Sequence, residues 1–193
     1  FSDLGNNKFG FGVADVSGKG IKSSLLMSKA SSLYRCLSKT IFSASSLLKI
    51  LNDEICETTT RGMFVTMIVG VYDKNKNELL LSNAGHEPPL IFSSDGNFKT
   101  VDEAGPPLGI APNFKFTEQT ISFKESSMYI FTDGITEMKN TNGDMLGQEG
   151  FQDYIKKYQS TPNNKRLQKI IEDLISSGRI QKDDLTIVTV DGK

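Results

Sequence analysis

The sequence predicts an α+β domain in which helices cover antiparallel sheets. A strand-like segment near the N-terminus is followed by two amphipathic helical segments, then by a run of short strands, and then by further helices and a last strand. Blocks of strands and helices of this kind are typical of layered α+β domains. The 193 residues, of which 37% are hydrophobic and 23% charged, suffice for one such domain with a sizeable core.

The first third of the chain predicts one strand and two helices. Residues 9–15 alternate like a strand and end in an acidic residue. The glycine loop 17–20 follows, and residues 21–37 then carry apolar side chains at helical spacing. A second helix is expected after a serine-rich start that is suited to capping. Its apolar stripe consists of Leu47, Leu48, Leu51 and Ile55.

The middle of the chain predicts antiparallel strands. The β-rich residues 64–72, the polar turn 73–77 and residues 78–83 together predict a hairpin. Three further extended segments are expected at residues 88–92, 114–123 and 127–132.

Helices are expected again beyond Gly150. Thr161 is a predicted helix cap, with Pro162 at the first helical position. The apolar stripe of this helix consists of Leu167, Ile170, Ile171, Leu174 and Ile175. Residues 185–190 predict the closing strand. Because no repeat or flexible linker divides the chain, we expect one domain over residues 1–193.

The charge and hydropathy of the chain exclude several classes of partner. The formal net charge of −1 gives no excess of positive charge for nucleic acid or for an anionic membrane surface. The longest apolar runs, such as residues 64–72, are too short to insert across a bilayer. The N-terminus lacks the basic and apolar regions of a signal peptide, so we expect a cytoplasmic location.

Acidic residues at predicted strand ends are the strongest chemical signal. Asp15 ends the first strand, Asp133 ends another, and Asp183 and Asp184 precede the last strand. Carboxylate oxygens are the natural ligands of Mg²⁺ or Mn²⁺, and a pair of such ions activates water and clamps a phosphoryl group. Aspartate beside glycine is also a turn signal, so a purely structural role remains open.

Other catalytic arrangements find less support. The loop 17–20 lacks the G-x-x-x-x-G-K-[ST] pattern of a nucleotide-binding loop, although its glycines would let backbone N–H groups approach a phosphate. His86, the one histidine, lies in a turn rich in Gly and Pro and is expected to be a hydrogen-bonded structural residue. Neither Cys36 nor Cys56 lies in a glycine-rich loop near an arginine, as a cysteine phosphatase would require.

Six motifs in order give the chain a family resemblance. They are Ala14-Asp15-Val16-Ser17-Gly18-Lys19-Gly20, Met63-Phe64-Val65-Thr66, Asn83-Ala84-Gly85-His86-Glu87-Pro88-Pro89-Leu90, Pro107-Leu108-Gly109, Thr132-Asp133-Gly134-Ile135-Thr136-Glu137 and Asp183-Asp184-Leu185-Thr186. With these motifs the chain resembles the SpoIIE/RsbU branch of the metal-dependent protein phosphatases, the superfamily that includes the type 2C enzymes.

The resemblance implies a fold and a metal centre. The fold would be a four-layer αββα sandwich of two antiparallel sheets flanked by helices. Two Mn²⁺ or Mg²⁺ ions would be bridged by Asp15, with a further ligand from the Val16 carbonyl. Asp133 and Asp183 would also bind metal, and Asp184 matches a polar position next to a ligand. Asp15, Asp133 and Asp183 are thus the expected catalytic residues, acting through a water that the metals activate.

The resemblance also implies a substrate and a regulatory setting. Family substrates are phosphoserine or phosphothreonine on a small protein of the anti-anti-sigma type, and a sensor domain often precedes the phosphatase. Members usually carry a G-G-D-x-Y-D motif on a strand that would precede Phe1, so we expect this domain to lack that strand and motif. Type 2C enzymes place a histidine where this chain has Ser17.

Two alternatives to an active phosphatase remain open. The chain would be a pseudophosphatase if it bound a phosphoprotein or regulator without hydrolysing it. It would be a structural or dimerisation domain if its aspartates were only turn residues, and manganese would then leave its melting temperature unchanged.

Overall fold

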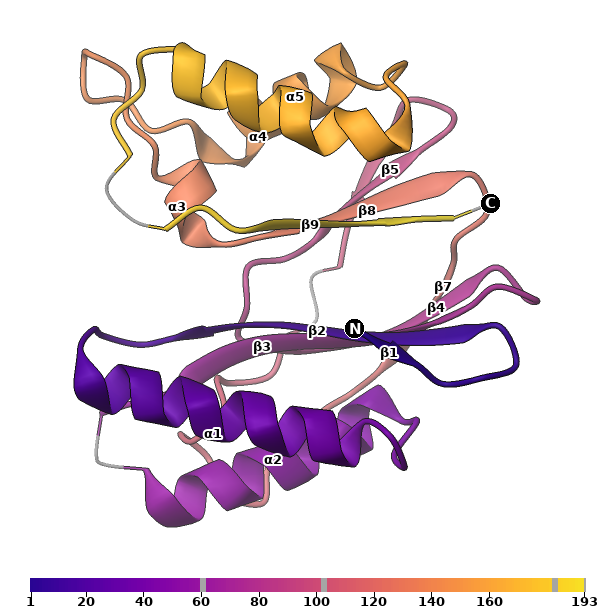
Figure 1. Cartoon of the computed structure of the whole chain (residues 1–193), viewed down its shortest axis with the longest axis vertical. Coiled ribbons are helices and arrows are strands. Elements are labelled where there is room, and N and C mark those ends of the chain that lie inside the picture. The colour runs from indigo at the N-terminus through magenta and orange to yellow at the C-terminus, as the bar shows by residue number, and fades with distance from the viewer. Residues whose placement is uncertain (60–61, 102–103, 182–183, 193) are drawn as a thin grey trace. The chain divides into compact units, whose positions relative to one another are not determined.

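Two antiparallel sheets, each with its own helices, organise the chain (Figure 1). The computed structural model describes residues 1–59, 62–101, 104–181 and 184–192. The chain divides into two units. The first consists of Phe1–Pro88 and Val101–Glu125 with Gly192, and the second of Pro89–Thr100 and Ser126–Asp191. The expected α+β class with two antiparallel sheets flanked by helices is confirmed, and the single-domain boundary stays a prediction.

The first unit contains a five-stranded sheet in the order β1-β2-β3-β4-β7. Its strands are β1 (Ser2–Asp3), β2 (Lys8–Val16), β3 (Val65–Asp73), β4 (Glu78–Ala84) and β7 (Gln119–Ser122). The two central strands β2 and β3 pair along their whole lengths. Asp15 stands opposite Thr66 at one end, and Lys8 stands opposite Asp73 at the other.

Two helices, α1 (Ile21–Leu37) and α2 (Ala44–Thr58), cover one face of this sheet (Figure 1). The apolar stripe predicted for α2 is fully buried and packs with Val65, Met67 and Val69 from alternate positions of β3. Ser43 caps α2, because its hydroxyl accepts a hydrogen bond from the Ser46 N–H at 3.2 Å. The predicted extents of both helices and the serine cap are therefore confirmed.

The second unit contains a four-stranded sheet in the order β6-β5-β8-β9. Its elements are β5 (Leu90–Ser93), β6 (Phe98–Thr100), β8 (Ser126–Phe131), α3 (Asp133–Thr136), α4 (Gly147–Lys157), α5 (Asn163–Ser176) and β9 (Ile187–Asp191). Phe151 from α4 and Leu174 from α5 share one buried cluster with Tyr129 and Phe131 of β8. The two longer helices thus cover one face of this sheet.

Three element predictions differ from the structure. The strand expected over 114–123 shrinks to β7, because Phe114 and Phe116 pack as an aromatic pair on the first core instead of joining the sheet. The helix expected after Thr161 begins at Asn163, with Pro162 in the cap position and no side-chain cap bond. The short strands β1 and β6 were not predicted, because two or three residues are too few to show alternation.

Among the described residues, no helix combines the length and the apolar character needed to cross a membrane.

Candidate active site

Asp15 is the penultimate residue of β2, where the sheet of the first unit gives way to a loop. Its side chain is exposed, and its Oδ1 accepts a hydrogen bond from the Val16 N–H at 2.9 Å. Val16 pairs with Val65 and packs against the helix-covered core. Because neighbouring strand residues point to opposite faces, the Asp15 side chain lies on the face away from α1 and α2.

Ser17 fastens the loop that follows Asp15. Its N–H donates to the Phe64 carbonyl at 3.0 Å, and the Phe64 N–H donates to the Ser17 hydroxyl oxygen at 2.8 Å. The Ser23 hydroxyl donates to the Ser17 carbonyl at 3.1 Å and so ties the loop to the first turn of α1. The side chain at the position of the type 2C histidine therefore holds backbone in this chain.

His86 belongs to a buried network behind Asp15. It is 4% exposed, and its Nδ1 lies 3.0 Å from the Thr66 hydroxyl, which lies 3.4 Å from the Asp15 carbonyl oxygen. The Asn83 side chain accepts from the His86 N–H at 2.8 Å and donates to the His86 carbonyl at 2.9 Å. The interpretation of His86 as a hydrogen-bonded residue is confirmed, and the network braces the strand end that carries Asp15.

Asp133 is the first residue of α3 in the second unit, directly after buried Phe131 and Thr132. Its side chain is exposed. The sequence predicted a strand end followed by a turn, and the turn is instead a four-residue helix. The difference is small, because one tight turn satisfies the backbone in either case.

Thr132 joins the Asp133 segment to the segment that contains Asp184. Its N–H donates to the Thr186 carbonyl at 3.2 Å. Its hydroxyl lies 3.4 Å from the Asp184 carbonyl oxygen and 3.3 Å from the Thr186 nitrogen, which donates to it. The last strand begins at Ile187 instead of residue 185, because these preceding residues bond to Thr132. Two acidic motifs about fifty positions apart in the sequence are thus fastened together.

Gly134 permits the close approach of these two segments. A Cβ atom built on Gly134 would lie 2.3 Å from the Asp184 carbonyl oxygen, a separation that no packed structure tolerates. The glycine after Asp133 is therefore required by packing, in addition to being a turn signal.

The expected metal ligands fall into two described groups. Asp15 and Val16 lie in the first unit, and Asp133 and Asp184 lie in the second. Asp183 lies outside the described residues. Within residues 1–59, 62–101, 104–181 and 184–192, no group of three or more His, Cys, Asp or Glu side chains could hold a metal ion.

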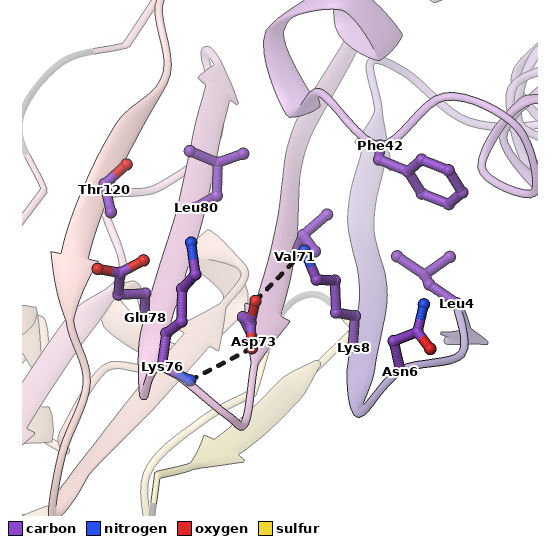
Figure 2. A pocket seen from close by; sticks show the side chains of 10 residues that line it. All are labelled: Leu4, Asn6, Lys8, Phe42, Val71, Asp73, Lys76, Glu78, Leu80 and Thr120. Atoms are coloured by element: carbon purple, nitrogen blue, oxygen red, sulfur yellow. Dashed lines mark hydrogen bonds and ion pairs between the residues drawn. The ribbon is translucent and has the colours of Figure 1, made fainter.

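A cavity of about 330 Å³ lies at the far end of the first sheet from Asp15 (Figure 2). Lys8 and Asp73 pair at its base with 3.3 Å between Nζ and Oδ2. Leu80, Val71 and Phe42 supply apolar walls. Because the cavity sits at the opposite end of β2 and β3, it provides a reference surface for changes that should not affect the Asp15 end.

Sequence reasoning missed one buried amide that shapes the Asp15 end of this unit. Asn52 is 0% exposed within the apolar stripe of α2. Its Nδ2 donates to the Ala111 carbonyl at 2.8 Å, and its Oδ1 accepts from the Gly109 N–H at 3.1 Å. A polar residue at a stripe position was the available signal, because buried amides are kept only where they find partners.

Residues 5–193 match the family described as Stage II sporulation protein E (SpoIIE). Over 181 residues the chain is 29% identical to "Phosphoserine phosphatase RsbU" of Bacillus subtilis (strain 168), a match that covers 92% of this chain and 54% of RsbU. This chain therefore spans about half the length of that relative.

Solved structures share the fold. The RsbU and RsbW domains of Rv1364c from Mycobacterium tuberculosis superpose with a TM-score of 0.80 at 23% identity, covering 95% of this chain and 51% of that one. The catalytic domain of the serine threonine protein phosphatase PstP, in complex with 2 manganese ions, superposes with a TM-score of 0.69 at 13% identity. That match covers 99% of this chain and 93% of PstP's domain.

Proposed function

The chain belongs to the SpoIIE family of RsbU-type, metal-dependent protein phosphatases, and from this membership we propose that it hydrolyses phosphoserine or phosphothreonine on a regulatory protein. The observation that best supports the proposal is the link from Thr132 and Gly134 to the Asp184 segment. This link makes sense if the acidic residues on both segments must stay close together. A set of turn residues would not need it.

Asp15, Asp133 and Asp183 would hold two divalent ions, with the Val16 carbonyl as a further ligand and Asp184 beside them. Exposed carboxylates and a backbone carbonyl are hard oxygen donors, which fit Mn²⁺ or Mg²⁺. The manganese ions of the PstP complex support the same class of metal. When bound, such ions lower the pKa of a water and offset negative charge on phosphoryl oxygens.

The protein's own residues would orient this centre. The Val16 N–H fixes one oxygen of Asp15, and the contacts among Thr66, His86 and Asn83 brace the backbone behind it. The Ser17 hydroxyl accepts from the Phe64 N–H and serves the loop. With serine in place of the type 2C histidine, protonation of the leaving alkoxide falls to water.

The substrate would be a phosphoprotein of the anti-anti-sigma type, and an upstream sensor would control the reaction. The RsbU relative and the RsbU and RsbW domains of Rv1364c support a regulatory phosphoprotein and regulatory partners. The cytoplasmic location expected from the sequence stays a prediction.

Manganese titration on three proteins tests the proposal against its alternatives. We expect Mn²⁺ to raise the melting temperature of the wild-type protein, since a ligand present at 100 times its Kd stabilises the native state by about 2.7 kcal/mol. Asp15→Asn and Asp133→Asn should shrink that rise while remaining folded. A flat response of the wild type would favour a structural domain. A normal response without release of phosphate from a phosphoserine peptide would favour a binding module.

A further inference from the structure

A second and larger cavity, of about 740 Å³, opens in the first unit. It lies among the last turns of α2, the residues that lead into β3 and the segment 109–113. The residues that matter here are Asp53, Glu57, Met63, Phe64, Ile110 and Pro112. Its size falls within the range of cavities that bind ligands or peptide side chains.

The cavity lies at the Asp15 end of the sheet. Phe64 lines it and also bonds through its N–H and its carbonyl to Ser17, two residues beyond Asp15. An extended residue advances about 3.3 Å, so Ser17 is only about 7 Å along the chain from Asp15. A peptide whose phosphorylated residue lay at Asp15 could therefore reach the cavity with its neighbouring residues.

The cavity walls are held in place by buried hydrogen bonds. The Asn52 side chain binds the backbone at Gly109 and Ala111, and the Asp53 Oδ1 accepts from the Asn113 N–H at 2.8 Å. These contacts attach segment 109–113 to α2. Because the walls are preformed, a bound peptide would not have to order them, which lowers the entropic cost of binding.

The lining combines negative charge with apolar surface. Asp53 and Glu57 contribute carboxylates, and no lysine or arginine is among the described lining residues. Lys49 lies 2.8 Å from Asp53, and its hydrogen bond holds the pKa of that carboxyl below its usual value. Glu57 is exposed at the rim, and Ile110 is 55% exposed. Such walls suit the apolar stem and charged head of lysine or arginine.

Cysteine chemistry in this cavity is disfavoured. Burial raises the pKa of the Cys56 thiol, and the Sγ donates to the Asn52 Oδ1 at 3.6 Å. A protonated, hydrogen-bonded thiol is a poor nucleophile. The cavity therefore has the features of a recognition site.

We propose that this cavity binds a basic segment of the phosphoprotein substrate, next to the phosphorylated residue. The inference rests on the proposed phosphatase function and adds to it a preference for lysine or arginine beside the phosphoresidue. Charge complementarity selects this occupant, since an acidic flank would meet Asp53 and Glu57 as like charges.

Two phosphoserine peptides that differ only in carrying lysines or glutamates beside the phosphoserine provide the test. Amide ¹H–¹⁵N shifts of the metal-free protein, recorded as each peptide is added, report where binding occurs. The ratio of kcat/KM between the peptides in Mn²⁺ reports the preference. Glu57→Lys is the test variant, and Glu78→Lys, in the cavity at the other end of the sheet, is the matched control.

We expect the lysine peptide to shift residues 109–113 and to be hydrolysed at least about fivefold more efficiently, the scale of one partly exposed ion pair. Glu57→Lys should remove that preference, and Glu78→Lys should keep it. Equal use of both peptides, or a preference that survives Glu57→Lys, would overturn the inference. Failure to hydrolyse para-nitrophenyl phosphate would instead count against the proposed function, and the shifts would still decide whether the cavity takes the basic peptide.

Discussion

Ser17 and Thr132 have the same task at the two acidic segments. Each is a short hydroxyl side chain that accepts a backbone N–H from a neighbouring segment, Phe64 in one case and Thr186 in the other. Exposed aspartates cannot fix their own position through packing, so adjacent polar residues do it. The geometry of the site thus depends on residues that carry no charge.

Gly134→Ala tests how closely the two segments of the second unit must approach. The added methyl would meet the Asp184 carbonyl at 2.3 Å, so one segment must move. We expect phosphate release to fall at least about tenfold and stability to fall by about 1–3 kcal/mol, as in other overpacked sites. Phosphate release and urea unfolding provide the two measurements.

Gly10→Ala is the control for that variant. A methyl at Gly10 meets only the flexible Leu4 side chain at 3.4 Å, so activity and stability should change little. If Gly134→Ala behaved like Gly10→Ala, the close approach would have no functional weight.

Asn52→Leu tests the buried amide of α2. Leucine fits the apolar surroundings but leaves the Gly109 N–H and the Ala111 carbonyl unpaired. We expect a loss of about 2–3 kcal/mol in the urea-unfolding free energy, because buried unpaired groups are costly. Asn164→Ala, at an exposed position of α5, should stay within about 0.5 kcal/mol. Equal effects of the two changes would contradict the assigned role.

At the scale of elements, one arginine attaches α5 to the second sheet. The Arg166 Nη1 donates to the Ser127 hydroxyl at 3.0 Å and to the Tyr129 hydroxyl at 3.1 Å, and it lies 3.5 Å from Asp191. These partners belong to β8 and β9. Arg166 therefore supplements the apolar packing of the helix with a directional contact.

Arg166→Met should destabilise the second unit. Methionine replaces the stem but leaves the Asp191 carboxylate and the buried Tyr129 hydroxyl without the guanidinium. We expect a loss of about 2–4 kcal/mol by urea unfolding, since removing one partner of a partly buried pair costs more than the pair contributes. Arg166→Lys keeps the charge but not the planar fork, so it should recover only part of the loss. Full recovery would show that charge alone matters.

The contact between α4 and α5 predicts a pH dependence. The Lys157 Nζ lies 2.6 Å from the Asp173 Oδ2, and its hydrogen bond holds the pKa of that carboxyl below its ordinary value. A lowered folded-state pKa stabilises the protein above the unfolded-state pKa of about 3.9, and this contribution disappears as the pH falls through the folded-state value. Asp173→Asn should therefore be less stable than wild type at pH 7, by a small amount because the pair is solvated.

Urea unfolding at pH 7 and at pH 2.5 measures this difference. We expect the gap between wild type and Asp173→Asn to close at the lower pH. A gap of the same size at both values would mean that the carboxylate's charge contributes nothing.

At the scale of the whole molecule, long periodic segments were the predictable part of the fold. The stripe on α2 and the paired run of β3 and β4 were predicted because each buries one continuous face. The segment 114–118 was not, because its aromatic residues suit a strand equally well and only tertiary packing places them on the core.

The site was predictable as residue types and not as geometry. Asp15 and Asp133 were identified from their motifs, and the structure describes each at the edge of its own sheet. The Thr132 contacts and the cavity beside Glu57 depend on residues from distant segments. Sequence spacing carries no information on such contacts.

Release of phosphate from para-nitrophenyl phosphate, with and without Mn²⁺, tests the central claim most directly. The wild-type protein and Asp133→Asn are compared, with Asp153→Asn as a control at an exposed position of α4. We predict manganese-dependent release by the wild type and by Asp153→Asn, and none above background by Asp133→Asn. Equal release by Asp133→Asn, or none by the wild type in Mn²⁺, would contradict the account.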